Sequence, residues 1–165
     1  MHKSGLKTER VAERRDDHTI RFFGRFSKFS NFHPVTLQYQ GFLFKSAEQL
    51  YHFKRAQMTN NESLAIAIAL SLDPLDSKRL AKDIEPEKDR DLRIMREVIE
   101  MNFSKDTFKK ELVNTKKAEL IECNPHDRFW GSGYHLDEKT PTKSGANHLG
   151  NVLMEFRNKI VNPLK

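Results

Sequence analysis

The chain has one cysteine and no long apolar run, and these absences narrow the classes of protein to which it can belong. Cys123 cannot form an internal disulfide, which favours a reducing compartment. A buried structural thiol is the favoured interpretation of Cys123, and a catalytic thiol is the alternative. No segment approaches the roughly 20 apolar residues of a membrane-spanning helix, and the N-terminus lacks the hydrophobic stretch of a signal peptide. We therefore expect a cytoplasmic protein without membrane contact.

Several motifs of cofactor and metal chemistry are also missing. The sequence has neither the Gly-x-Gly-x-x-Gly fingerprint of dinucleotide-binding folds nor the Gly-Lys-Ser/Thr of a P-loop. Its seven histidines are scattered, without the spacing that is typical of metal ligands. We therefore expect neither a Rossmann nor a P-loop domain, and we predict no metal site and no cofactor.

Charge and phenylalanine are plentiful. Of the 165 residues, 32% are charged and twelve are Phe, which indicates one soluble domain with an aromatic core. The net charge of +6 favours an anionic partner, either a nucleic acid or a phosphate-bearing small molecule. Much of the positive excess lies near the N-terminus, so residues 1–18 are predicted to be a flexible basic arm before a single domain over residues 19–162. Such an arm suits electrostatic contact with nucleic acid and is equally consistent with a solvated tail.

Hydrophobic periodicity predicts a helix-rich α+β fold with a small N-terminal β-sheet. Short strands are expected at residues 20–22, 35–39, 42–44 and 118–122, the second and third of them as a hairpin. Helices are expected at about residues 46–58, 61–70, 74–84, 88–102 and 108–112, and a last helix begins near Asn147. The third of these helices is expected to turn Leu75, Leu80 and Ile84 inward. The last is expected to bury Leu149, Val152, Leu153, Phe156 and Ile160, with Arg157 on its flank.

The most informative segment is the turn Asp127-Arg128-Phe129-Trp130-Gly131-Ser132-Gly133, which holds the only tryptophan of the chain. Glycines let the backbone approach a ligand closely, and a tryptophan offers a flat apolar face with one N–H donor. Such a turn suits a flat polar ring such as a nucleobase. It is equally consistent with a tight loop above a tryptophan of the core.

Two acids are candidates for catalysis. Glu48 follows an aromatic strand at the start of a predicted helix, where apolar surroundings would favour the protonated acid. The alternative is an ordinary partner of the helix dipole. Asp127 is likewise either functional or a routine turn residue. Glu48 and Arg55 are seven residues apart and share one face of the helix, whereas Lys54 lies well off that face.

A third segment, residues 29–34, places small polar groups between aromatic side chains. Ser30 and Asn31 are candidates for reading ribose or base edges, and Phe32 for stacking on a ring. The same residues also fit an ordinary turn before Pro34, with Phe32 in the core.

Taken in order, these segments resemble the NADAR family of YbiA-type N-glycosidases over about residues 20 to 160. The family pattern combines an aromatic strand, a Ser-Asn-Phe segment, an acid at a helix start, an Asp-x-x-Trp-Gly-x-Gly turn and a glycine-containing last helix. The matching residues are Phe22 and Phe23, Ser30 to Phe32, Glu48 and Gln49, Asp127 to Gly133, and Gly145, Asn147, Leu149, Gly150, Leu153, Met154 and Arg157.

The resemblance implies hydrolysis of an N-glycosidic bond between a ribose and an amine-bearing group, without a metal or cofactor. Members are associated with phosphorylated riboflavin-pathway intermediates, with ADP-ribose-type compounds and with removal of ADP-ribose from guanine in nucleic acid. The implied partner is thus a nucleotide or ADP-ribose-type small molecule, or ADP-ribosylated DNA or RNA. The alternative is a module that binds ADP-ribose or nucleotides without cleaving them.

The resemblance also implies site residues, and this chain departs from the family pattern at one of them. Many members carry a lysine seven residues after the helix-start acid, where this chain has Arg55, with Lys54 beside it. A guanidinium stays protonated and cannot form an imine. We therefore expect Glu48 as the main acid or base, assisted by Asp127, with Lys54 as a further catalytic candidate. The expected substrate-binding residues are Arg21, Phe22, Ser30, Asn31, Phe32, Arg55, Trp130, Gly131, Asn147 and Gly150.

Overall fold

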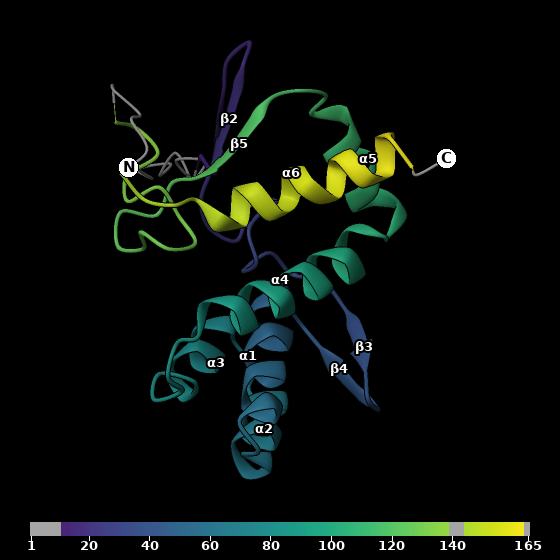
Figure 1. Ribbon diagram of the computed structural model, residues 1–165, viewed down its shortest axis with the longest axis vertical. Helices are drawn as coiled ribbons and strands as arrows, with labels where there is room; N and C mark the ends of the chain where they lie inside the picture. Colours follow the sequence, from purple (N-terminus) through teal and green to yellow (C-terminus); the bar gives the residue numbers. More distant parts are fainter. Residues whose placement is uncertain (1–10, 139–143, 164–165) are drawn as a thin grey trace, which may run out of the picture.

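The computed structural model describes residues 11–138 and 144–163, which form six helices and five strands (Figure 1). The strands are β1 (Glu13–Arg15), β2 (Thr19–Phe22), β3 (Leu37–Tyr39), β4 (Phe42–Phe44) and β5 (Glu119–Glu122). The helices are α1 (Ala47–Met58), α2 (Glu62–Ala69), α3 (Pro74–Leu80), α4 (Lys88–Phe103), α5 (Asp106–Asn114) and α6 (His148–Val161). The predicted helix-rich α+β class is confirmed.

A three-stranded sheet in the order β1-β2-β5 sets the first two strands beside a strand about 100 residues further along the chain. β2 pairs antiparallel with β1 and parallel with β5, in a register that sets Phe22 opposite Glu122. β1 lies inside the segment that was expected to be a flexible arm, because Glu13 to Arg15 extend the sheet along β2. Residues 1–10, which carry the rest of the predicted basic arm, lie outside the described residues.

Helix α1 is the central helix of the group formed by α1, α2, α3 and α4. Its N-cap is Ser46, whose hydroxyl accepts a hydrogen bond from the Gln49 amide. Leu50 and Ala56 have no exposed surface, because α1 packs against α2, α3 and α4. Figure 1 shows α4 crossing the middle of the molecule, with α6 and the β1-β2-β5 sheet on one side and α1, α2, α3 and the β3–β4 hairpin on the other.

Two expectations about helix faces are wrong. Leu75 and Leu80 of α3 remain 43% and 41% exposed, and only Ile84, beyond the end of the helix, is buried. α3 has only two turns, and its buried residue is Ser77, whose hydroxyl lies 2.7 Å from that of Ser71. Packing through a small polar side chain therefore leaves the leucines in solvent.

The second correction concerns α6. Leu149, Val152 and Leu153 are buried as predicted, whereas Phe156 and Ile160 are half-buried. Arg157 is not on an open flank: its guanidinium is buried and donates hydrogen bonds to the Thr115 hydroxyl and the Ala118 carbonyl. Those bonds anchor α6 to the segment that leads into β5.

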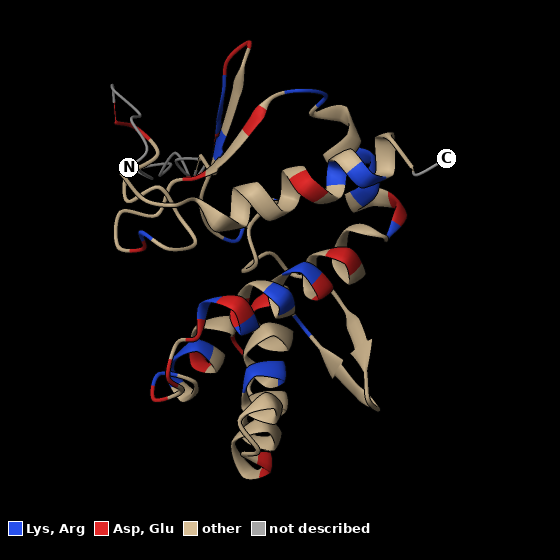
Figure 2. Cartoon of the chain, in the orientation of Figure 1, with Lys and Arg blue, Asp and Glu red and all other residues tan. Residues whose placement is uncertain are grey.

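An aromatic core connects these elements, as the composition predicts. Five phenylalanines have at most 1% of their surface exposed: Phe22, Phe29, Phe44, Phe53 and Phe103. Residues of opposite charge alternate along α4 (Figure 2). Cys123 is buried, and burial raises the pKa of its thiol, which opposes a nucleophilic role. In the described part of the chain, no helix has the length and apolarity to cross a membrane.

Candidate active site

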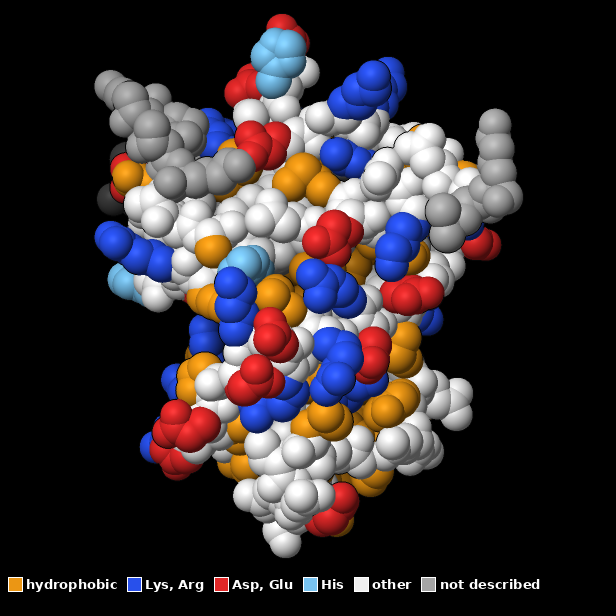
Figure 3. Space-filling view, viewed as in Figure 1, with side chains coloured by type: hydrophobic (Ala, Val, Ile, Leu, Met, Phe, Trp, Pro, Cys, Tyr) orange, Lys and Arg blue, Asp and Glu red, His pale blue; other side chains and the backbone are white. Residues whose placement is uncertain are grey.

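One cavity of about 450 Å³ lies where α1, α3, α4 and the turn after β5 meet. This volume is in the range typical of sites for small ligands. In the space-filling view the molecule narrows between its two halves, at the level of α4 (Figure 3). Polar, charged, aromatic and a few apolar side chains line the cavity. They are Asn31, Phe32, Glu48, Tyr51, His52, Arg55, Lys78, Pro86, Lys88, Asp91, Met95, Glu122, Asn124, Asp127, Phe129, Trp130 and Leu149.

One wall of the cavity is a chain of polar contacts that begins at Glu48. The Oε1 atom of Glu48 lies 2.8 Å from Nε2 of His52, one helical turn further along α1. Nδ1 of His52 lies 3.2 Å from a guanidinium nitrogen of Arg55. Because a guanidinium only donates hydrogen bonds, this Nδ1 accepts, and Nε2 carries the proton that His52 donates to Glu48. The Glu48 carboxylate is thereby held in one orientation.

Arg55 is itself fixed from two sides. Its Nη2 donates to the Ile84 carbonyl at 3.2 Å, and its Nε lies 3.4 Å from Oδ1 of Asp91 on α4. The Arg55 side chain is only 8% exposed and that of Asp91 6%, so this ion pair is largely removed from water. Asp91 also pairs with Arg90, whose Nη2 lies 2.9 Å from the same Oδ1. Loss of the Asp91 charge would leave the buried Arg55 guanidinium without its ionic partner, which is strongly destabilising.

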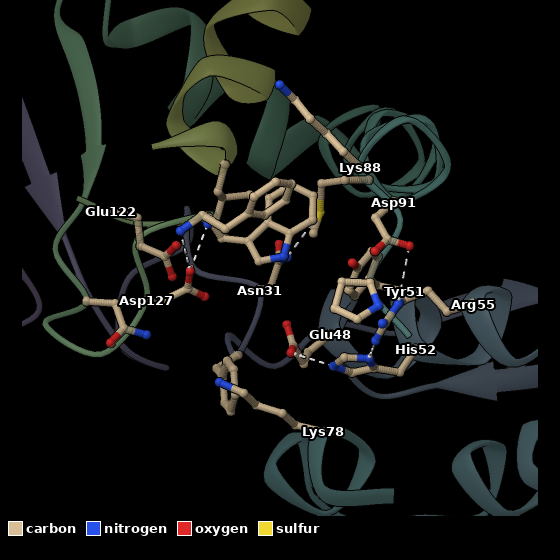
Figure 4. A pocket seen from close by; sticks show the side chains of 17 residues that line it. Asn31, Glu48, Tyr51, His52, Arg55, Lys78, Lys88, Asp91, Glu122 and Asp127 are labelled. Atoms are coloured by element: carbon tan, nitrogen blue, oxygen red, sulfur yellow. Dashed lines mark hydrogen bonds and ion pairs between the residues drawn. The ribbon is translucent and has the colours of Figure 1, made fainter. Parts of the chain in front are cut away.

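The opposite wall is acidic and comes from the end of β5 and the turn after it. Asp127 closes this turn: its Oδ1 accepts hydrogen bonds from the amides of Phe129 and Trp130 at 2.9 and 2.8 Å. Glu122 ends β5, and its Oε2 is buried without a hydrogen-bond partner among the described residues. Figure 4 shows Glu122 and Asp127 on one side of the cavity and Glu48 and His52 on the other.

Burial and neighbouring charge favour the protonated form of Glu122. Removal from water is the largest effect, followed by the negative charges of Asp127 and Glu48, whereas Lys78 opposes them. Together they raise the pKa of Glu122 to about 8. This carboxyl group is therefore mostly a neutral O–H donor at pH 7.

Aromatic rings also line the cavity. Trp130 is half-buried and meets Tyr51 edge to face, with ring centroids 5.5 Å apart. It also packs edge to face on Phe129, at 4.8 Å. Burial raises the pKa of Tyr51, so its phenol stays neutral. Trp130 and Phe32 both line the cavity.

Two lysines lie at the rim. Lys78 on α3 and Lys88 at the start of α4 are exposed, and Figure 4 places them at opposite ends of the cavity. Each ammonium group is a compact positive charge that suits an anionic ligand. Among the described residues, no group of three or more His, Cys, Asp or Glu is arranged to hold a metal ion.

The structure brings six of the expected site residues together around this cavity. They are Asn31, Phe32, Glu48, Arg55, Asp127 and Trp130. The amide nitrogen of Asn31 lies 3.2 Å from the Met95 sulfur, and its Oδ1 is buried without a hydrogen-bond partner in the described part of the chain. That oxygen is available to accept a hydrogen bond from a ligand.

Seven expected residues do not line the cavity, and the first four are Lys54, Arg21, Phe22 and Ser30. Lys54 lies on another face of α1, paired with Glu97 and 4.6 Å from the centre of the Tyr39 ring. Its position follows from the helical geometry that already separated it from Glu48. The other three belong to the framework: Arg21 donates to the carbonyls of residues 136 and 138, Phe22 is part of the core, and the hydroxyl of Ser30 accepts from the Phe32 amide.

The other three expected residues, Asn147, Gly131 and Gly150, support the fold behind the cavity and do not line it. The backbone of Asn147 is in the left-handed conformation, with φ 51°. Its side-chain amide donates a hydrogen bond to the Leu120 carbonyl and accepts one from the Glu122 amide. A Cβ on Gly150 would overlap the same Leu120 carbonyl, and a Cβ on Gly131 would lie 2.9 Å from the Asp127 carbonyl. These three residues hold α6 and the turn against β5, and so position Glu122 and Asp127.

Other residues that line the cavity were not expected from the sequence: Glu122, Asn124, Lys78, Lys88 and Asp91. A signal for Glu122 was present: it is the last residue of a predicted strand, five positions before Asp127, and ligands often bind beyond the carboxyl ends of parallel strands. The lysines and Asp91 had no such signal, because only tertiary packing brings α3 and α4 to the cavity.

The fold and the cavity define an α+β protein with a small-ligand site walled by carboxyl groups and aromatic rings. The family model of the NADAR domain matches residues 15–161, and the chain belongs to this family. It is 28% identical over 142 residues to N-glycosidase Npun_R5314 of Nostoc punctiforme, a match that covers 82% of this chain and 86% of that protein. It is 27% identical over 154 residues to the chloroplastic riboflavin biosynthesis protein PYRR of Zea mays, covering 82% of this chain and 24% of that protein.

A solved structure shows the same fold. The NMR structure of the E. coli protein YbiA matches with a TM-score of 0.69 and 23% sequence identity, over 92% of this chain and 90% of YbiA. The predicted YbiA-like fold is confirmed.

Proposed function

We propose that the protein is an N-glycosidase that hydrolyses the bond between a ribose and the nitrogen of an amine-bearing group. The observation that carries this proposal is the Glu48 carboxylate, held by His52 in a ligand-sized cavity opposite the carboxyl groups of Asp127 and Glu122. Carboxyl groups on opposite sides of a glycosidic bond are the usual machinery of glycoside hydrolysis. The named N-glycosidase of Nostoc punctiforme supports the same reaction class.

In this reaction Glu48 acts as the base. It accepts a hydrogen bond from His52 through Oε1, which leaves the other lone pairs of the carboxylate to orient a water molecule toward the anomeric carbon. The positive charge that develops on the ribose ring is stabilised by the carboxylates of Glu48 and Asp127. Trp130 and Phe32 contact the base, and the Oδ1 atom of Asn31 accepts a hydrogen bond from the substrate.

The water acts directly rather than after formation of an imine. Lys54 is on another face of α1 and is paired with Glu97, so it does not reach the ribose. Arg55 occupies the family's lysine position and stays protonated. Its ion pair with Asp91 gives it a positioning role behind His52.

The substrate is a phosphorylated ribose compound of the ADP-ribosylated or ribose-phosphate class. Lys78 and Lys88 at the rim suit its phosphates, and the net charge of +6 suits ADP-ribosylated DNA or RNA as well as a free nucleotide. Release of ADP-ribose from guanine would then reverse a nucleic-acid modification. The riboflavin biosynthesis protein of Zea mays supports a ribosylamine phosphate as the other member of this class.

A second candidate function is a module that binds ADP-ribose or nucleotides without cleaving them. The position of Arg55 favours it, because a fixed ion pair stands where many family members carry lysine. The two functions differ in their products.

Mass spectrometry distinguishes them directly. The protein is incubated with ADP-ribosylated guanosine, ADP-ribosylated DNA, ADP-ribose and a ribosylaminopyrimidine 5′-phosphate, and melting temperature is recorded with the same compounds. An N-glycosidase releases the free amine or base together with the sugar phosphate. A binder raises the melting temperature and returns every compound intact, which would refute the proposed function.

A further inference from the structure

Glu122 has a property that the proposed role of Glu48 does not use. It lines the cavity from the end of β5, and its Oε2 is buried with no hydrogen-bond partner among the described residues. An unpaired carboxylate in such a place is costly, whereas a neutral carboxylic acid carries an O–H that can donate to a ligand. Figure 4 shows the Glu122 carboxyl group beside Asp127, across the cavity from His52.

The charges around Glu122 come from four elements. Asp127 on the following turn and Glu48 on α1 disfavour a third negative charge, and Lys78 on α3 is the cation whose effect opposes theirs. The remaining charges that line the cavity are arranged differently: Asp91 and Arg55 form an ion pair, Lys88 is exposed at the rim, and His52 donates to Glu48. The surroundings thus keep Glu122 protonated at neutral pH.

The chemistry of a ribosylamine requires such a group. When the bond between C1′ and nitrogen breaks, the electron pair stays on nitrogen, and an amine that leaves without a proton is a poor leaving group. A positioned acid that protonates it typically accelerates such a reaction by about 10² to 10⁴. Glu48 accepts a proton from the attacking water, so the donated proton has to come from another group.

Resting on the N-glycosidase function proposed above, we propose that Glu122 is the general acid that protonates the departing nitrogen of a ribosylamine. The proton on Oε2 passes to the nitrogen as the bond between C1′ and nitrogen breaks. Water forms the new bond between C1′ and oxygen and gives its proton to Glu48. Solvent then returns a proton to Glu122 and removes one from Glu48, so the net reaction is hydrolysis of the N-riboside.

This assignment predicts which substrates depend on Glu122. A pyridinium riboside, such as nicotinamide mononucleotide, releases a neutral pyridine and needs no proton on its leaving nitrogen. The test therefore compares kcat/KM of the wild type and Glu122→Gln on nicotinamide mononucleotide and on a ribosylaminopyrimidine 5′-phosphate, between pH 5 and pH 9. Glu100→Gln, on the exposed face of α4, is the matched control.

The expected result is selective. Glu122→Gln lowers kcat/KM for the ribosylamine at least 100-fold and for the pyridinium compound less than fivefold. In the wild type, the ribosylamine reaction declines above about pH 8 and the pyridinium reaction does not. Equal loss on both substrates, or loss on neither, would overturn the assignment.

Two further outcomes separate this assignment from the function on which it rests. If the wild type cleaves only the ribosylamine, the pH dependence of kcat/KM becomes the test of Glu122. A wild-type kcat/KM that does not decline above about pH 8 overturns the role of Glu122 alone. If the wild type cleaves no riboside in the panel while circular dichroism shows a folded protein, the proposed function fails, and the role of Glu122 fails with it.

Discussion

From the burial of Glu122 we predict a pH dependence of the free energy of unfolding that does not depend on any substrate. Replacing Glu122 by glutamine keeps the size and hydrogen-bonding capacity of the side chain and removes its charge at high pH. In the folded protein the pKa of Glu122 is about 8, against 4.5 for an unperturbed glutamate. A pKa that is raised on folding contributes stability that is complete below pH 4.5 and declines as pH rises toward 8.

The size of this effect follows from the shift. One pKa unit corresponds to about 1.4 kcal/mol, so between pH 5 and pH 9 the wild type should lose about 4 kcal/mol of unfolding free energy relative to Glu122→Gln. Urea unfolding at several pH values, followed by the fluorescence of Trp130, measures both curves. The variant should be equal to the wild type at pH 5 and more stable at pH 9. Parallel curves across this range would refute the burial of a neutral acid at residue 122.

Three other predictions concern the framework, the aromatic wall and the rim. Gly150→Ala should destabilise the protein by about 3 kcal/mol, because its Cβ would overlap a β5 carbonyl; an unchanged urea midpoint would contradict this. Trp130 is the only tryptophan and lines the cavity, so ADP-ribose or a ribose phosphate should change its fluorescence, and saturation without change would exclude contact. Lys78→Ala and Lys88→Ala should each raise KM for a phosphorylated substrate roughly tenfold, measured against the exposed control Lys109→Ala; equal KM values would exclude a phosphate-binding rim.

The fold was largely predictable from local sequence. The expected helices at residues 46–58, 61–70 and 74–84 all form. Their N-caps are Ser46, Asn61 and Asp73, and N-cap chemistry is local. The predictions that were wrong concern contacts between segments that are distant in the sequence. The exposure of Leu75 depends on how α3 packs on α1, and β1 forms because β2 offers it a partner. Neither contact has a signal in the short-range pattern.

The candidate site was predictable in part for the same reason. Glu48 and Arg55 share the cavity because helical spacing places them on one face, and this spacing also separates Lys54 from them. The parallel pairing of β2 with β5 and the bonds of Asn147 across β5 bring the opposite wall into place. Those contacts join residues about 25 to 100 positions apart, so the burial of Glu122 beside Asp127 and opposite Glu48 follows only from the three-dimensional structure.

The central claim is that this cavity cleaves a ribose–nitrogen bond with Glu48 as the base. The measurement that tests it most directly is the rate of free-amine release from a ribosylaminopyrimidine 5′-phosphate by the wild type, Glu48→Gln and the surface control Glu100→Gln, each checked for folding. We predict turnover by the wild type and the control, and at least a 100-fold lower rate for Glu48→Gln. Equal rates for Glu48→Gln and the wild type would contradict the account.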